Sequence, residues 1–288
     1  MIAKKFECLL VTLLVVLQLS NVCLGEPANN QGSARARLQT GRYGPQITKI
    51  IRHEDWVQLR VKFDQHKSGI FEVVKRTARG TLPALRRLVG PLKRLVVNVQ
   101  ISPISARPSK LPSWVRAQYS QGQIVVYVPA YVEADGVLES DRAELVSASL
   151  RHELTHAYVQ SFTKQRAPGW LEEGLAQWTD PIDPPRLTSA LRRRVLGGAL
   201  LSLGYLNGPF TRLDKRLVPI AYAQSFFAVQ VLINRYGSAK FRRFLSALRT
   251  LPLKRAFFHA YSLSFSDFES ELRDELEMWA ESDQDLIL

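Results

Sequence analysis

Two histidines and a glutamate stand close together near the middle of the sequence. Residues 152–156 read His-Glu-Leu-Thr-His, which is the HExxH pattern. Because histidines four residues apart project from the same face of a helix, both imidazole rings can reach one metal ion. The glutamate between them can take a proton from a water molecule that the metal has acidified. The pattern predicts a catalytic metal centre with His152 and His156 as ligands and Glu153 as general base.

A catalytic centre of this kind needs a third protein ligand and one open position. A structural zinc site would use four ligands, often cysteines, and the two cysteines of the chain, Cys8 and Cys23, both lie near the N-terminus. Residues 170–176 read Trp-Leu-Glu-Glu-Gly-Leu-Ala after a Pro-Gly turn. A helix that begins there can fold back and aim a carboxylate at the metal, and on chemistry alone either Glu172 or Glu173 could serve. Two imidazoles and a carboxylate suit zinc best.

These two segments resemble the gluzincin zinc metallopeptidases, especially the bacterial peptidase-MA-like domains. The resemblance extends from about residue 57 to 276, and its specific parts are His-Glu-x-x-His and Trp-Leu-x-Glu-Gly-x-Ala. In the family's pattern the glutamate directly before glycine binds zinc, which implies Glu173 as the third ligand. The resemblance also implies one zinc ion per chain, and hydrolysis of peptide bonds by a zinc-activated water with Glu153 as general base.

The chain departs from the family's pattern in two places. Some gluzincins place an acid four residues after the third ligand, where it orients a histidine ligand. Here that position is Gln177, and Asp180 follows further on. The chain also lacks the Gly-x-Met-Glu-Asn segment with which aminopeptidase relatives hold a free amine, so exopeptidase specificity has no support.

The resemblance continues in residues 221–225, Ala-Tyr-Ala-Gln-Ser. It implies Tyr222 as the donor that stabilises the oxyanion, because a phenol donates a hydrogen bond without titrating near neutral pH. The other interpretation is a core tyrosine on an apolar helix, and the sequence favours neither. Tyr158, two residues after the second histidine, is a weaker candidate.

Hydrophobic periodicity predicts the elements that position these residues. Strands are expected over residues 56–63, 95–101 and 123–128. Helices are expected over 68–88, where Gly80 and Pro83 could split the helix, and over 139–162, 170–178, 187–203, 219–236, 239–248 and 266–281. Strands with one helical hairpin followed by an all-helical half indicate an α+β enzyme with a cleft between two lobes. The resemblance to the family implies a small twisted sheet with helices, followed by a helical lobe.

The first 25 residues have the layout of a secretory signal peptide. Lys4 and Lys5 precede an apolar run over residues 8–19, and Gly25-Glu26 offers a cleavage point. Cleavage would give an exported protein, periplasmic or extracellular, without cysteine; an uncleaved N-terminal anchor is the alternative. We expect a flexible leader over 26–50 and a metallopeptidase domain over 51–288, with a sheet lobe over about 51–165 and a helical lobe over about 166–288.

The composition indicates a globular and strongly basic protein. Hydrophobic residues make up 46% of the chain, charged residues 23%, and the formal net charge is +13. Such an excess favours anionic partners, although scattered arginines favour a solvated basic surface and no nucleic acid is expected. The function predicted first is a peptidase acting on peptides or proteins. The alternative is an inactive zinc-binding relative that recognises an anionic envelope surface, and the presence of Glu153 favours the enzyme. The sequence does not indicate an oligomeric state.

Overall fold

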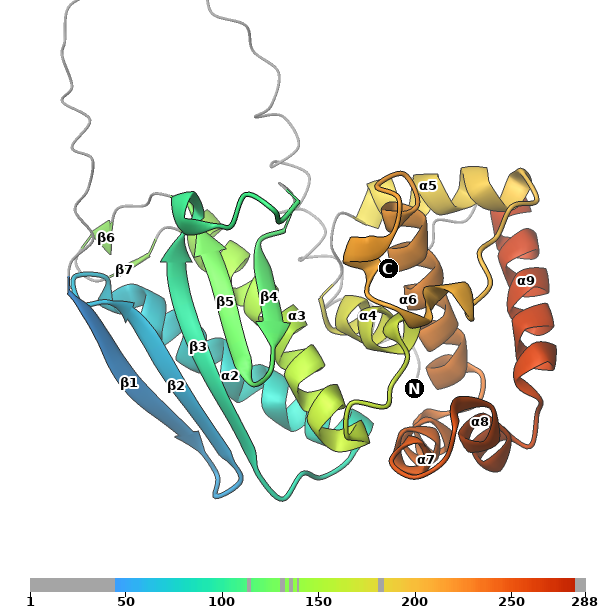
Figure 1. Cartoon of the computed structure of the whole chain (residues 1–288), viewed down its shortest axis with the longest axis horizontal. Helices are drawn as coiled ribbons and strands as arrows, with labels where there is room; N and C mark the ends of the chain where they lie inside the picture. Colours follow the sequence, from blue (N-terminus) through green and yellow to red (C-terminus); the bar gives the residue numbers. More distant parts are fainter. Residues whose placement is uncertain are drawn as a thin grey trace, which may run out of the picture. The chain divides into compact units, whose positions relative to one another are not determined.

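A five-stranded sheet lies in the first half of the described chain in the computed structural model (Figure 1). The structure describes residues 45–112, 115–129, 133–134, 137–138, 140–180 and 184–282. The strands lie in the order β1-β2-β3-β5-β4. They are β1 (Gln46–His53), β2 (Val57–Asp64), β3 (Leu95–Pro103), β4 (Ala117–Ser120) and β5 (Gln123–Val128). β2, β3 and β5 run parallel, and the two edge strands β1 and β4 run antiparallel to their neighbours.

The alternation of side chains along β2 shows why the sheet forms. Val57, Leu59, Val61 and Phe63 are buried, while every second side chain between them points away from the core. This period of two places one face of the sheet against the helices. A separate two-stranded ribbon consists of β6 (Glu133–Ala134) and β7 (Val137–Leu138).

Two long helices, α2 (Ser68–Val89) and α3 (Ser140–Thr163), cover the same face of the sheet (Figure 1). The helix predicted over 68–88 forms without the split that Gly80 and Pro83 could have caused, because α2 continues through both residues. Proline removes the hydrogen bond to the carbonyl of Arg79, four residues earlier. Arg79 lies on the exposed side of α2, where water can satisfy that carbonyl.

The second half of the described chain is helical. It contains α4 (Gly169–Thr179), α5 (Pro184–Leu196), α6 (Val218–Asn234), α7 (Ser238–Leu248), α8 (Leu253–Tyr261) and α9 (Phe265–Glu281). Short 3-10 turns occur at η3 (Ile104–Ala106), η4 (Tyr205–Asn207) and η5 (Phe210–Arg212). α6 is apolar on nearly every side and forms the centre of this half, with α4 packed against it. The α+β prediction is confirmed. Among the described helices, none has the length and apolar character needed to cross a membrane.

The elements of the structure differ from the predicted ones in four places. β1 begins at Gln46, inside the leader expected over 26–50, and β4 lies between two predicted strands where no strand was expected. Both are edge strands, with mainly exposed side chains in β1 and mainly half-buried ones in β4, so their hydrogen-bonded partners stabilise them rather than apolar periodicity. The helix α8 was not expected, and α5 ends at Leu196 instead of 203, just before Gly197 and Gly198. Gly198 has a φ of 63°, which favours glycine.

The predicted signal peptide and residues 26–44 of the expected leader lie outside the described residues. Both remain predictions.

Candidate metal centre

The HExxH residues lie on α3, and α4 runs back along this helix in the opposite direction. At one end the amide of Gln160 donates to Oε2 of Glu172 (2.8 Å). Nearer the other end the hydroxyl oxygens of Thr155 and Thr179 lie 2.8 Å apart. These two contacts join α3 to α4 at two separate points, so the side chains between the contacts face each other.

The residues around Glu173 on α4 are closely packed, and this packing explains the glycine that follows Glu173. Trp170 and Leu171 are fully buried. A Cβ on Gly174 would collide with the backbone oxygen of Ser225 on α6, so only glycine allows this close approach of α4 to α6. The conformation that presents Glu173 to α3 therefore depends on the packing of α4 against α6.

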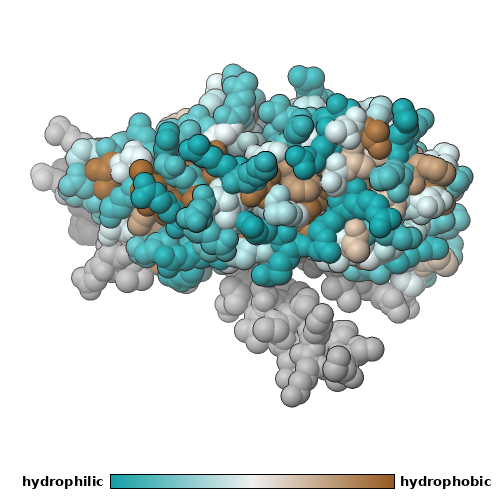
Figure 2. Space-filling model, turned by 90° about the horizontal axis from the view of Figure 1, so that it is seen from below, coloured by the Kyte–Doolittle hydropathy of each residue, from teal (hydrophilic) through white to brown (hydrophobic). Residues whose placement is uncertain are grey.

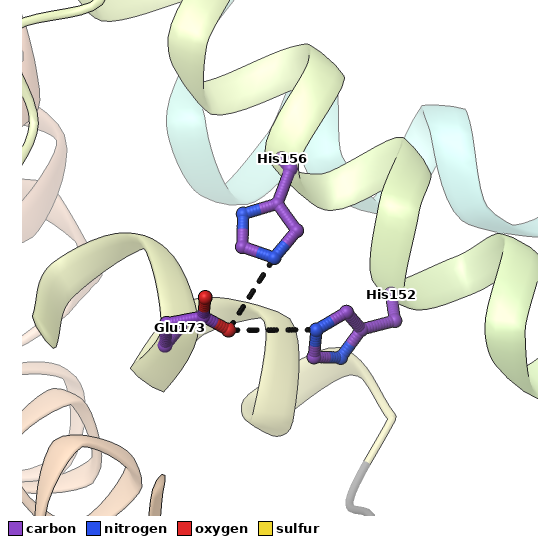
Figure 3. A group of neighbouring side chains, drawn as sticks. All are labelled: His152, His156 and Glu173. Atoms are coloured by element: carbon purple, nitrogen blue, oxygen red, sulfur yellow. Dashed lines mark ion pairs between the residues drawn. The ribbon is translucent and has the colours of Figure 1, made fainter. Parts of the chain in front are cut away.

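Glu173 faces both histidines (Figure 3). Its Oε2 atom lies 3.5 Å from Nε2 of His152 and 3.4 Å from Nε2 of His156. One ligand atom from each of the three residues lies within 4.8 Å of the others. A tetrahedral zinc site with bonds of about 2.0–2.1 Å has edges of about 3.3 Å, which matches the two distances to Glu173.

The electrostatics of these three residues also fit a cation. Burial raises the pKa of Glu173, but the two histidines outweigh that effect and lower its pKa to about 2. Its Oε2 atom is buried and makes no hydrogen bond within the described part of the chain. A buried, ionised oxygen between two imidazole nitrogens is suited to metal binding, so the residues present fit zinc.

Glu153 lies beside this cluster and is itself buried. Burial raises its pKa, although the two histidines lower it in part. Its carboxylate also accepts a hydrogen bond from the backbone N–H of Tyr119, on the edge strand β4. This contact was not predictable from the sequence, because the donor is a backbone group and β4 itself was not expected.

Glu172 contacts the opposite edge of one histidine ring. Its Oε2 atom lies 3.7 Å from Nδ1 of His156, while Nε2 of the same ring faces Glu173. The two neighbouring glutamates thus take different positions around His156. Glu173 is the one that faces Nε2 of both histidines, and the contact of Glu172 with Nδ1 of His156 was not expected from the sequence.

Tyr222 extends from α6 toward the same group. Its ring meets Phe210 edge to face, with the centroids 5.2 Å apart. Burial raises its pKa well above the usual value, and the charges of Glu173 and Glu153 raise the pKa further. The phenol therefore stays protonated within electrostatic reach of both carboxylates. In contrast, the hydroxyl of Tyr158 donates to the backbone oxygen of Gly90 (2.5 Å), so Tyr158 has a packing role.

The family model of the Peptidase MA superfamily matches residues 119–277, which is more than half of the chain. The match begins in β4 and ends in α9, and therefore includes α3, α4 and α6. The chain belongs to the Peptidase MA superfamily. The predicted resemblance is confirmed at this level.

Solved structures similar to this superfamily member are M1 zinc metallopeptidases. A two-domain M1 zinc metallopeptidase mutant bound to L-arginine is 17% identical, with a TM-score of 0.40, and the match covers 85% of this chain and 54% of that one. An M1 zinc metallopeptidase mutant from Deinococcus radiodurans is 16% identical, with a TM-score of 0.39 and coverages of 83% and 52%. The chain thus spans about half the length of these proteins, and no protein of curated function matches it. Likeness at this level carries no conclusion about the site.

This member of the Peptidase MA superfamily has no carboxylate four residues after Glu173. Gln177 occupies that position and is buried. Asp180, the next acid, is bound by the guanidinium of Arg151 through Nε (3.0 Å) and Nη2 (2.7 Å). Arg151 therefore compensates its charge; burial raises the pKa of Asp180 and the charge of His152 lowers it in part, but no hydrogen bond or ion pair in the described part of the chain joins the two residues. Besides Glu173, the carboxylate that contacts one of the two HExxH histidine rings is Glu172, through Nδ1 of His156.

Proposed function

We propose that this chain is a zinc-dependent peptidase that hydrolyses peptide bonds. The observation that carries the proposal is the triangle formed by His152, His156 and Glu173 with Glu153 buried beside it. Three protein ligands leave a fourth position for water or substrate, as catalytic zinc sites do. A zinc ion held there supplies Lewis acidity, which acidifies water and polarises a carbonyl group.

Glu153 has the environment of a general base that later acts as an acid. Its raised pKa brings proton uptake and release closer to neutral pH, where a carboxylate of ordinary pKa is a weak base. The hydrogen bond from Tyr119 holds the carboxylate in place. The same group can take a proton from water and deliver it to the leaving amine.

Tyr222 is the proposed donor to the oxyanion. Its raised pKa keeps the proton on the phenol, so the hydroxyl can donate a hydrogen bond but does not compete as an anion. A donor of this kind is most useful where negative charge develops during the reaction.

The edge strand β4 supports an extended peptide as substrate. The N–H of Tyr127 on β5 donates to the oxygen of Arg116, so the alternating antiparallel pattern turns the backbone groups of Ala117 and Tyr119 away from β5. An extended peptide can add to such an edge by hydrogen bonds to the backbone of Ala117 and the carbonyl of Tyr119, whose N–H already donates to Glu153. This favours a peptide or protein over a small molecule.

Export is part of the proposal and rests on the first 25 residues alone. The alternative function, an inactive zinc-binding relative, is less favoured because Glu153 is buried and held by a hydrogen bond beside the proposed ligands. An inactive relative would have no need to bury a carboxylate there.

The test combines zinc content with hydrolysis of a mixed library of quenched fluorescent peptides. We expect about one zinc per chain and cleavage by the native chain. Glu153→Gln should keep the zinc and lose about 10²–10⁴-fold in activity. Glu173→Gln should lose both zinc and activity. Absence of zinc in every form after reconstitution, or full activity in Glu153→Gln, would contradict the proposal.

A further inference from the structure

Two long segments of the chain contain basic residues and no acidic ones. Residues 73–132 contain ten lysines and arginines, and residues 235–266 contain seven, without one aspartate or glutamate in either segment. By contrast, residues 267–281, in α9, contain seven acidic residues and a single arginine. The net positive charge is thus concentrated in particular segments of the chain.

The two acid-free segments meet in the fold. The guanidinium of Arg242 on α7 donates to the backbone oxygen of Arg87 at the end of α2 (2.6 Å). The guanidinium of Arg249 lies 5.5 Å from the centre of the Phe162 ring. That ring packs against Gly90, where a Cβ would lie 2.9 Å from it. The end of α2, the following loop and α7 therefore form one surface.

The helix α8 extends this surface. The rings of Phe244 and Phe257 pack edge to face, with centroids 5.3 Å apart, and join α7 to α8. The exposed side of α8 carries Lys254 and Arg255 and, one turn later, Phe258. Phe258 is 60% exposed. Figure 2 views the molecule from the side where α7 and α8 lie in Figure 1, and most of the described surface there is hydrophilic.

We name this surface the basic face and define it by six exposed residues. They are Arg87, Lys93, Arg242, Arg249, Lys254 and Arg255. The nearby acid Glu54 is paired with Arg86, 3.8 Å away, and not with a member of the face.

We propose that the basic face binds the anionic headgroups of a lipid membrane, with Phe258 entering the interface. Clustered lysines and arginines are attracted to anionic lipid, and an exposed aromatic residue on a basic helix can bury its ring at the headgroup boundary. A single-stranded nucleic acid would need several aromatic rings for stacking, and within α7 and α8 Phe258 is the one exposed phenylalanine, tyrosine or tryptophan. The proposal is independent of the proposed peptidase activity.

The test is sedimentation with vesicles of phosphatidylglycerol and phosphatidylcholine, using the whole chain. Vesicles of phosphatidylcholine alone measure charge-independent binding, and every variant carries the same N-terminal segment. Each basic residue near an anionic membrane contributes about fivefold to binding, so Arg242→Gln, Lys254→Gln and Arg255→Gln together should weaken it by about a hundredfold. The control is Arg60→Gln, Lys62→Gln and Lys110→Gln, three exposed basic residues on β2 and the loop after β3, which should change binding by much less.

The aromatic contribution is tested separately. Phe258→Ser should weaken vesicle binding several-fold, while Met278→Ser on α9, which removes a residue that is 64% exposed, should not. Equal losses in the two triple variants would overturn the proposal, because net charge alone would then explain binding. It would also be overturned if Phe258→Ser bound vesicles as well as the native chain while the basic face bound soluble polyphosphate or single-stranded DNA. That result would indicate a polyanion partner.

Discussion

The carboxylate of Glu172 lies 3.7 Å from Nδ1 of His156, on the opposite edge of the ring from the nitrogen that faces Glu173. The amide of Gln160 holds the same carboxylate oxygen at 2.8 Å. This arrangement can fix both the ring orientation of His156 and the nitrogen that carries its proton. Groups that orient metal-binding histidines in this way commonly change the metal affinity as well as the geometry of the site.

Glu172→Ala should therefore weaken zinc binding by about 10–100-fold without removing a ligand. Glu172→Gln retains an oxygen that can accept from Nδ1, so its loss should be smaller. Competition with a zinc chelator measures both affinities, and Glu277→Gln, an exposed residue of α9, is the control. Equal affinity in Glu172→Ala and the native chain would show that Glu172 does not orient His156.

Zinc binding should release a proton from His156. Burial alone would lower the pKa of His156, but the carboxylates of Glu173, Glu172 and Glu153 raise it well above its usual value. The metal-free histidine is then protonated at neutral pH, whereas a metal ligand must be neutral. Protons thus compete with zinc, and the apparent zinc affinity should fall about tenfold for each pH unit below the pKa of His156.

Calorimetric zinc titrations in buffers of different ionisation enthalpy measure that proton. The apparent enthalpy should vary with the buffer at neutral pH, and Glu172→Ala should reduce the variation because one of the carboxylates that raise the pKa of His156 is removed. Identical heats in all buffers would mean that His156 is already neutral.

Tyr222→Phe should lower kcat by about 10²–10³-fold while zinc content stays unchanged, because it removes one hydrogen-bond donor and keeps the ring against Phe210. Steady-state kinetics with a cleaved peptide measures the effect. Tyr205→Phe is the matched control, since Tyr205 is 55% exposed and should tolerate the change. An unchanged kcat in Tyr222→Phe would leave the core-tyrosine interpretation.

Two glycine substitutions should change stability in opposite directions. Gly174→Ala forces a Cβ into the backbone of α6 and should lower the free energy of unfolding by about 1–3 kcal/mol or more. Gly80→Ala lies within α2, where a Cβ would meet nothing within 4 Å, and should raise it by about 1 kcal/mol. Denaturant unfolding measures both changes. A stable Gly174→Ala variant would contradict the close packing of α4 on α6.

Local spacing in the sequence was enough to place the main elements and to select the candidate metal ligands. The four-residue interval between His152 and His156 has a definite meaning on any helix, and α3 brings both rings to one side. The choice between Glu172 and Glu173 needed the resemblance to a family, because adjacent residues differ only in the direction that the helix gives them. The assignment of zinc ligands is still a prediction, although the geometry suits it.

The sequence by itself determined the α+β class, the superfamily resemblance and the helix that carries HExxH, because each depends on patterns within a few turns of chain. Only the tertiary structure decided that Glu172 contacts Nδ1 of His156, that the backbone of Tyr119 holds Glu153, and that two acid-free segments form one basic face. These contacts join residues far apart in the chain or involve backbone atoms, so their formation depends on how packed helices and paired strands meet. Hydrophobic periodicity and residue spacing along the sequence do not indicate which distant residues come into contact.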